Sequence, residues 1–236
     1  MASLLLNLRC QARGGPMEIT RILVQMHAEE YLKKNDPLGW FEAVYAAAKG
    51  DELAIPWVNL SPNPHLVEWL DTNPMPSGKK ALVVGCGLGD DAEELSRRGF
   101  FVTAFDISPT AIEWCRKRYP LSKTRYETQD LFKAPAGWKQ FFDLVVEIYT
   151  LQSLQSPLRE QAIQTIARFA APQGIVLAIT RAKEANEFPE GPPWPVTKSE
   201  LALFSQAGLK PQTFDDFKDL EDPPIRRFRA AYQRPT

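Results

Sequence analysis

Apolar and polar residues follow two different periods along the chain, which together predict alternating strands and helices. Short apolar runs rich in β-forming residues predict buried strands at residues 81–84, 100–105, 123–128, 141–148 and 175–180. Apolar residues spaced three or four positions apart predict amphipathic helices at residues 90–98, 109–119 and 157–171. Strands that alternate with helices in this way indicate an α/β protein with a parallel sheet.

The N-terminal quarter of the chain has a different pattern. Helical periodicity at residues 18–34 and 38–48 is followed by proline-rich segments that separate these helices from the first core strand. We therefore expect residues 17–78 to form an N-terminal helical cover and residues 79–236 to form the main domain. Residues 1–16 lack any pattern, and we expect them to be disordered.

The C-terminal part contains a long polar loop, a helix and two further strands. Residues 181–195 are rich in proline and charge, and a loop of this length at a strand end is typical of a lid or a substrate loop. Thr197, with Glu200 three positions later, predicts a capping box at the start of the helix. Residues 209–217 and 226–233 then predict a pair of terminal strands.

Three glycines join the first core strand to its helix in the stretch ALVVGCGLGDD, at Gly85, Gly87 and Gly89. Glycines permit positive φ and let a ligand approach the backbone closely. Asp90 is expected to cap the helix, whose free N–H groups attract an anionic group. Asp106 ends the next strand, where a carboxylate with few packing contacts can bind both hydroxyls of a ribose. This order therefore predicts a nucleoside ligand that carries an anionic group.

The spacing of these glycines favours one class of nucleoside ligand over another. Dinucleotide-binding turns have the pattern G-x-G-x-x-G, whereas the third glycine here comes one residue early, as G-x-G-x-G. That spacing resembles motif I of class I methyltransferases, which depend on S-adenosylmethionine (SAM). A tight turn without any ligand is the structural alternative.

Polar residues at the ends of later strands add to the expected site. Asp130 follows the third strand, where it could accept the adenine amino group while Leu131 supplies a backbone N–H; a plain turn or helix-cap acid is the alternative. Glu147 and Tyr149 lie at the end of the fourth strand, and ligands of open parallel sheets bind at such carboxyl ends. We take both as candidate catalytic residues, and structural residues at a strand end as the alternative.

The composition limits which binding partners we expect for this chain. The 28 basic and 29 acidic residues give a net charge of −1, so no broad basic surface for nucleic acid is expected. Three arginines, at positions 226, 227 and 229, are interpreted as edge-strand charges, with an anionic acceptor as the alternative. Cys10, Cys86 and Cys115 form neither a disulfide framework nor a metal spacing, which favours a cytoplasmic protein without a metal. No apolar stretch is long enough for a membrane span.

The pattern as a whole resembles the class I SAM-dependent methyltransferases. The resemblance rests on VVGCGLG, on the strand-end acids in FDIS and TQDLF, and on the fourth strand, FDLVVE. It implies a Rossmann-like, seven-stranded and mostly parallel sheet with helices on both faces, in which residues 79–236 form the SAM-binding catalytic domain. The cofactor-binding residues that it implies are Gly85, Cys86, Gly87, Gly89, Asp106, Ile107, Asp130, Leu131 and Glu147.

The flanking segments resemble the thiopurine, thiol and halide methyltransferase-like superfamily more closely. The residues that carry this likeness are I-P-W at 55–57, P-N-P-H-L-V at 62–67 and G-P-P-W-P-V at 191–196. In such relatives an N-terminal tryptophan lies near SAM, which favours Trp57 as a cofactor contact over ordinary packing. Cys86 is common in this motif and receives no redox role.

These patterns predict methyl transfer to a small-molecule acceptor such as a thiol, another soft nucleophile, an amine or a hydroxyl. Transfer from a sulfonium mainly requires alignment and the exclusion of water, and an anionic acceptor requires no base. Two alternatives are an NAD(P)-dependent oxidoreductase and a SAM-binding protein without catalytic activity. The early third glycine disfavours the first, and the expected aromatic cover disfavours the second.

Overall fold

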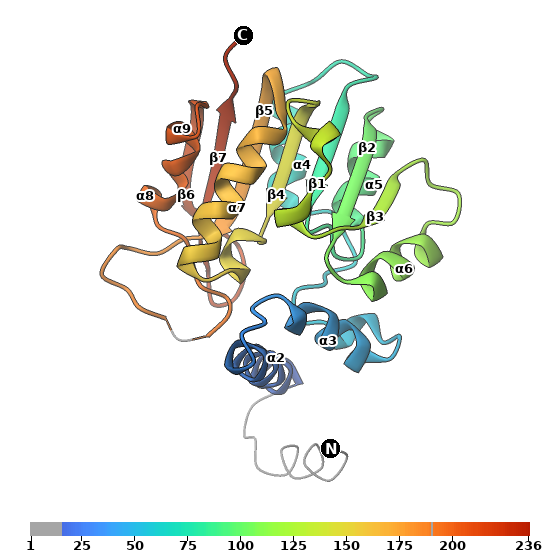
Figure 1. Ribbon diagram of the computed structural model, residues 1–236, viewed down its shortest axis with the longest axis vertical. Coiled ribbons are helices and arrows are strands. Elements are labelled where there is room, and N and C mark those ends of the chain that lie inside the picture. Colours follow the sequence, from blue (N-terminus) through green and yellow to red (C-terminus); the bar gives the residue numbers. More distant parts are fainter. Residues whose placement is uncertain (1–15, 190) are drawn as a thin grey trace. The chain divides into compact units, whose positions relative to one another are not determined.

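The computed structural model describes residues 16–189 and 191–236, which form two compact units (Figure 1). One unit ends at Asn59, and the other comprises Leu60–Thr236. The expectation for residues 1–16 lies outside the described residues except at Pro16, where helix α2 begins. Among the described residues, no helix combines the length and the apolar character needed to cross a membrane.

The described part of the N-terminal unit, residues 16–59, contains two α-helices, as its periodicity predicts. Helix α2 spans Pro16–Lys33, α3 spans Gly39–Ala48, and a short 3₁₀ turn, η1, spans Glu52–Ala54. The chain reverses between α2 and α3 because Asp36 precedes a proline and its carboxylate accepts a hydrogen bond from the Gly39 N–H (2.9 Å).

The larger unit is built around one seven-stranded sheet with the strand order β3-β2-β1-β4-β5-β7-β6 (Figure 1). Strands β1 to β5 are parallel, and β7 is antiparallel to both β5 and β6. The predicted Rossmann-like fold class is therefore confirmed. The strands are β1 (Lys80–Val84), β2 (Phe101–Asp106), β3 (Arg125–Thr128), β4 (Phe142–Ile148), β5 (Ala170–Arg181), β6 (Lys210–Lys218) and β7 (Arg226–Gln233).

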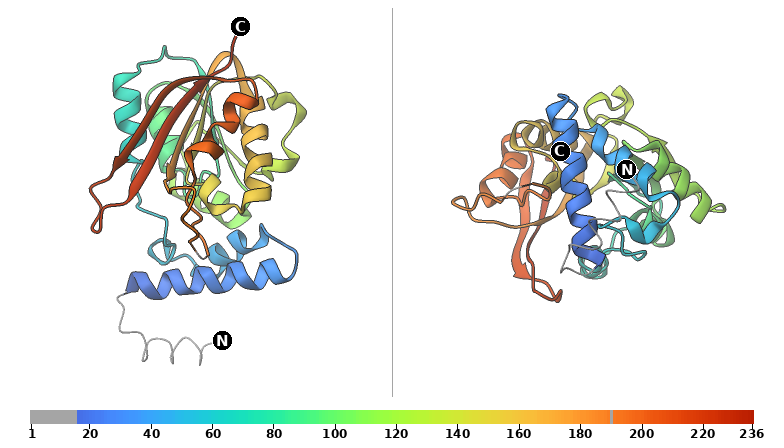
Figure 2. Two further views of the ribbon diagram at one scale, coloured as in Figure 1. Left: turned by 90° about the vertical axis from the view of Figure 1, so that its left-hand side faces the viewer. Right: turned by 90° about the horizontal axis from the view of Figure 1, so that it is seen from below.

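Helices cover both faces of this sheet, which explains why its strands are apolar on both sides. Helix α7 lies on one face, and α4 and α5 lie on the opposite face (Figure 2). Leu66 of α4, Leu95 of α5 and Ile112 of α6 share a buried cluster with alternate strand residues such as Val83 and Val146. The helices are α4 (Pro64–Thr72), α5 (Asp90–Arg97), α6 (Pro109–Arg118), α7 (Ser156–Phe169), α8 (Lys198–Leu201) and α9 (Leu203–Gln206).

Three local expectations differ from the structure. The arginines of β7 are not on an edge strand, because the terminal hairpin folds back and places β7 between β5 and β6. The helix cap before α5 is Gly89, so Asp90 is the first helical residue; its carboxylate binds Arg118 instead. Strand β5 begins at Ala170 rather than after Gly174, where the missing side chain lets the Phe142 carbonyl approach closely.

Candidate active site

The turn between β1 and α5 requires glycine at two positions for steric reasons. Gly85 has a φ of 61° and Gly89 a φ of 88°. A Cβ added to Gly85 would lie 2.4 Å from Thr150 Oγ1, and one added to Gly89 would lie 2.6 Å from the Tyr126 hydroxyl. Thr150 is fixed in this place because its hydroxyl donates to the Val84 carbonyl (3.0 Å). The turn therefore presents bare backbone in a defined conformation, as a cofactor cradle needs.

Asp106, at the end of β2, holds this turn in place. Its Oδ2 accepts a hydrogen bond from the Gly87 N–H (3.0 Å), and its Oδ1 accepts one from the Ser108 N–H (2.9 Å). The expectation that Asp106 has few contacts is wrong, because the residue is buried and organises the turn. An ionised carboxylate accepts up to about four hydrogen bonds, and its contact with the ribose hydroxyls stays a prediction. Ile107, which follows it, is half-buried.

The end of β3 meets the end of β2 at the same edge of the sheet, because the Gln129 N–H donates to the Asp106 carbonyl (2.9 Å). Asp130 comes next, and its Oδ1 accepts a backbone hydrogen bond (2.8 Å) at the start of η2 (Leu131–Lys133). The structure thus shows the helix-cap role for Asp130, one of the two roles that the sequence allowed. Its contact with adenine, and that of Leu131, stay predictions.

Glu147 is completely buried near the end of β4. Its Oε1 accepts a hydrogen bond from the Leu151 N–H (2.8 Å), whereas no described protein atom pairs with its Oε2. Burial raises the pKa of this carboxyl to about 8, so the neutral form predominates at pH 7. Glu147 therefore fixes the turn that follows β4 and presents one oxygen without a protein partner.

Tyr149 lies just beyond β4 with a φ of 65°, a backbone conformation that is rare for residues other than glycine. Burial raises the pKa of its hydroxyl, while the Arg227 charge and a hydrogen bond with the Asn63 side chain act in the opposite direction. The Arg227 guanidinium lies 4.7 Å from the centre of the Tyr149 ring and pairs with Asp219 (2.6 Å). Tyr149 is thus a neutral phenol among polar side chains.

The sequence did not single out Asn63 as part of the site, and it offered Arg227 only through the alternative that one of three arginines binds an anionic acceptor. Both come from elements far from β4 in the sequence: Asn63 caps α4, and Arg227 lies at the start of β7. His65, in the first turn of α4, has a pKa lowered by burial and then by the Arg227 charge, so it is uncharged at pH 7. In the sequence, the P-N-P-H segment indicated where α4 begins. The position of Arg227, in contrast, depends on the register of the hairpin formed by β6 and β7.

The remaining candidates are Trp57 and Cys86. Trp57 belongs to the N-terminal unit, where its indole N–H donates to the Tyr45 hydroxyl (2.9 Å) and its ring packs edge-on against Trp40. Its contact with the cofactor stays a prediction. Cys86 lies in the glycine turn as a free thiol whose pKa is raised by burial and the neighbouring Cys115.

Within residues 16–189 and 191–236, no group of three or more His, Cys, Asp or Glu side chains forms a metal site.

A family model described as a methyltransferase domain matches residues 81–174, from β1 to the irregular start of β5. The chain carries a class I methyltransferase domain. SAM is the cofactor of this class, so the predicted cofactor and the resemblance based on VVGCGLG are confirmed. The residues present also fit SAM: the turn has a bare backbone, the Asp106 carboxylate ends β2, and the neutral Glu147 carboxyl has an Oε2 without a protein partner.

Curated relatives of this methyltransferase chain include enzymes of sulfur chemistry. The probable thiol methyltransferase 2 of Arabidopsis thaliana is 28% identical over 173 residues, which cover 72% of this chain and 72% of that protein. Thiocyanate methyltransferase 1 of Brassica oleracea is 29% identical over 150 residues, or 61% and 63% of the two chains. The N-methyltransferase NodS from Bradyrhizobium japonicum WM9, solved with S-adenosyl-L-homocysteine (SAH), has the same fold, with a TM-score of 0.64 and 19% identity over 82% of this chain and 99% of that chain.

Proposed function

We propose that this methyltransferase acts on a small-molecule acceptor, and that thiolates and other soft anions are its preferred class. The proposal rests on the protonation state of the two candidate bases, Glu147 and Tyr149. Burial raises the pKa values of both Glu147 and Tyr149, so both are protonated at pH 7. A protonated amine or hydroxyl acceptor would need a base, whereas a thiolate needs none. The thiol and thiocyanate relatives agree with this choice.

The proposed roles follow from the strand-end geometry. When bound, SAM supplies a methyl group on a positively charged sulfur that is already activated for displacement. The backbone of Gly85, Cys86, Gly87 and Gly89 would hold its methionine part, Asp106 and Ile107 its ribose, and Asp130 and Leu131 its adenine. Glu147 would fix the floor of the site, and the Tyr149 hydroxyl would orient the acceptor. Trp57 would cover the cofactor and exclude water.

Methyl transfer to a panel of acceptors tests this proposal. The purified chain is incubated with SAM and thiocyanate, thiophenolate, a phenol or an amine at pH 7, and methylated products are measured by mass spectrometry. We expect products from the sulfur acceptors alone. Products from the phenol or the amine alone would contradict the proposed acceptor class. No product from any acceptor, in a protein that binds SAH, would favour a SAM-binding protein without catalytic activity.

We also propose that the chain works in the cytoplasm. Cys86 and Cys115 are free thiols in the structure, which suits a reducing compartment. Fractionation of cells that produce the tagged chain would test this location.

A further inference from the structure

A buried arginine on α7 connects the segments that follow β4 and β5. Arg159 is 3% exposed, and four of its five N–H donors have partners in the described chain. These partners are the carbonyls of Leu151 (2.9 Å), Leu154 (2.9 Å) and Trp194 (2.7 Å) and the carboxylate of Glu200. The first two belong to the turn after β4, the third to residues 191–196, and Glu200 to α8. One side chain thus binds three parts of the chain.

Both backbone polar groups of Trp194, the carbonyl and the N–H, form hydrogen bonds. Its carbonyl accepts from Arg159, and its N–H donates to the carbonyl of Gln152 (2.6 Å). The side chain of Gln152 in turn accepts a hydrogen bond from the N–H of Arg181 at the end of β5. Residues 191–196 are also joined to β5 directly, because the Val196 N–H donates to the Arg181 carbonyl (2.8 Å). This segment is therefore fixed beside the ends of β4 and β5.

The turn after β4 is fixed by the same arginine. Leu151 donates its N–H to Glu147 and accepts a hydrogen bond from Arg159 at its carbonyl. Glu200, the remaining partner, also closes the capping box with Thr197 at the start of α8. Arg159 therefore links the turn that carries Tyr149 to residues 191–196.

We propose that Arg159 is a positioning residue, which sets the acceptor-binding surface formed by residues 149–154 and 191–196. This inference rests on the proposed function, because it requires that the acceptor binds at this edge. Ligands of open parallel sheets bind beyond the carboxyl ends of the strands, and the cofactor-binding turn lies after the neighbouring strand β1. A planar guanidinium binds carbonyls of two segments and a carboxylate at fixed angles, which the single ammonium of lysine cannot reproduce.

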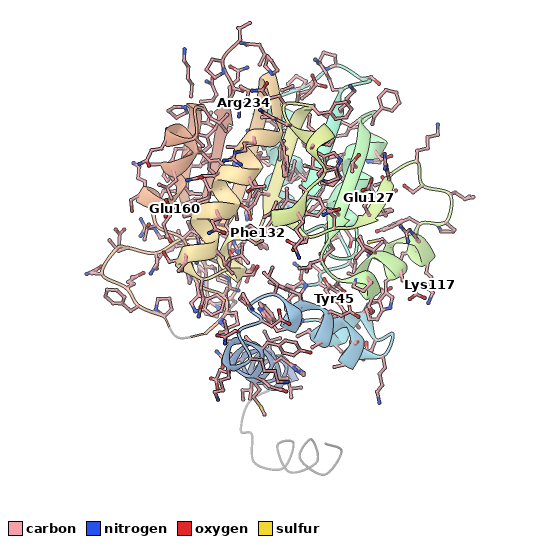
Figure 3. The ribbon with its side chains drawn as sticks, in the orientation of Figure 1. Tyr45, Lys117, Glu127, Phe132, Glu160 and Arg234 are labelled. Carbon is pink, nitrogen blue, oxygen red and sulfur yellow. The ribbon has the colours of Figure 1, made fainter. Side chains whose placement is uncertain are left out.

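Arg234 offers a matched control. It also donates to carbonyls around α7, at Ala167 (2.6 Å) and Ala170 (2.8 Å), but it lies at the opposite end of the sheet (Figure 3). Arg159→Met and Arg234→Met both remove a guanidinium that binds backbone carbonyls near α7. Only the first removes contacts with residues 149–154 and 191–196. A loss of global stability alone would therefore affect both variants.

Kinetics and binding are measured on the folded full chain at a temperature where all variants are native. We expect Arg159→Met to lower kcat/KM for thiocyanate and thiophenolate by about tenfold, equivalent to about 1.4 kcal/mol, mainly through a higher acceptor KM. The Kd for SAH should stay within about twofold of the wild type, since the glycine turn is untouched. Arg159→Lys should be intermediate, and Arg234→Met should match the wild type.

Hydrogen exchange supplies a second readout that needs no acceptor. Arg159→Met should speed exchange in the peptide with the Trp194 amide, and Arg234→Met should not. Equal acceptor kinetics in both variants, or unchanged exchange near Trp194, would overturn the positioning role. If the wild type methylates no acceptor yet binds SAH, the proposed function fails, and the exchange result alone decides whether Arg159 holds this surface.

Discussion

Replacing Glu147 by glutamine is expected to stabilise the folded chain, and increasingly so as the pH rises. Burial raises the pKa of this carboxyl from 4.5 to about 8, so between these values the folded chain keeps a proton that the unfolded chain has lost. The free energy of unfolding therefore falls with rising pH, by up to about 1.4 kcal/mol per unit. For these two pKa values, linkage gives a loss of about 2.5 kcal/mol between pH 5 and pH 7.

Glu147→Gln avoids this loss because an amide does not ionise, while its oxygen can still accept the Leu151 N–H. Urea unfolding of both proteins at several pH values from 5 to 8 measures the effect. The stability difference between variant and wild type should grow by about 2.5 kcal/mol from pH 5 to pH 7. Comparison with the wild type also cancels other groups, such as Asp91, whose pKa burial raises to about 6.

Glu160→Gln makes the same replacement at an exposed position of α7 and supplies the control (Figure 3). A difference between Glu147→Gln and the wild type that stays constant with pH would refute a buried, neutral carboxyl at this position. If the variant is more stable but transfers methyl groups more slowly, Glu147 is retained for activity at a cost in stability.

Three further predictions concern residues that we expect to bind the cofactor. Asp106→Asn should weaken SAH binding by roughly tenfold or more in calorimetry, because a hydrogen bond to a charged group contributes about 1.5–3 kcal/mol; unchanged affinity would remove its ribose role. Gly85→Ala should lower the free energy of unfolding by about 2 kcal/mol or more in urea, because φ is positive at this position and the added Cβ would clash with Thr150. Gly137→Ala should be neutral, because a Cβ added there has no atom within 4 Å. Trp57→Ala should weaken SAH binding more than Tyr45→Phe, which keeps the indole and removes the hydroxyl that accepts its hydrogen bond; equal affinities in both variants and the wild type would exclude Trp57 from the site.

The glycine turn and the strand-end acids could be predicted from the sequence because their signals are local. Gly85, Gly89 and Asp106 lie within about one βαβ unit, where the order of residues also sets their order in space. The identity of the fold followed from the same periodicity, since parallel strands that alternate with helices have few possible arrangements.

The acceptor side could not be predicted in the same way. Arg227 reaches Tyr149 only because β7 inserts between β5 and β6, and the register pairs Arg181 with Arg227. Arg159 has the sequence pattern of an ordinary helix residue, yet its partners come from three segments. The packing role of Asp106 was missed for a similar reason, because backbone N–H partners leave no trace in the sequence.

Titration calorimetry with SAH tests the central claim most directly, with NADH and NADPH titrated in parallel. The account predicts that SAH binds with one site per chain, that neither nicotinamide cofactor binds, and that Asp106→Asn weakens SAH binding. Binding of NADH or NADPH in place of SAH would contradict the account.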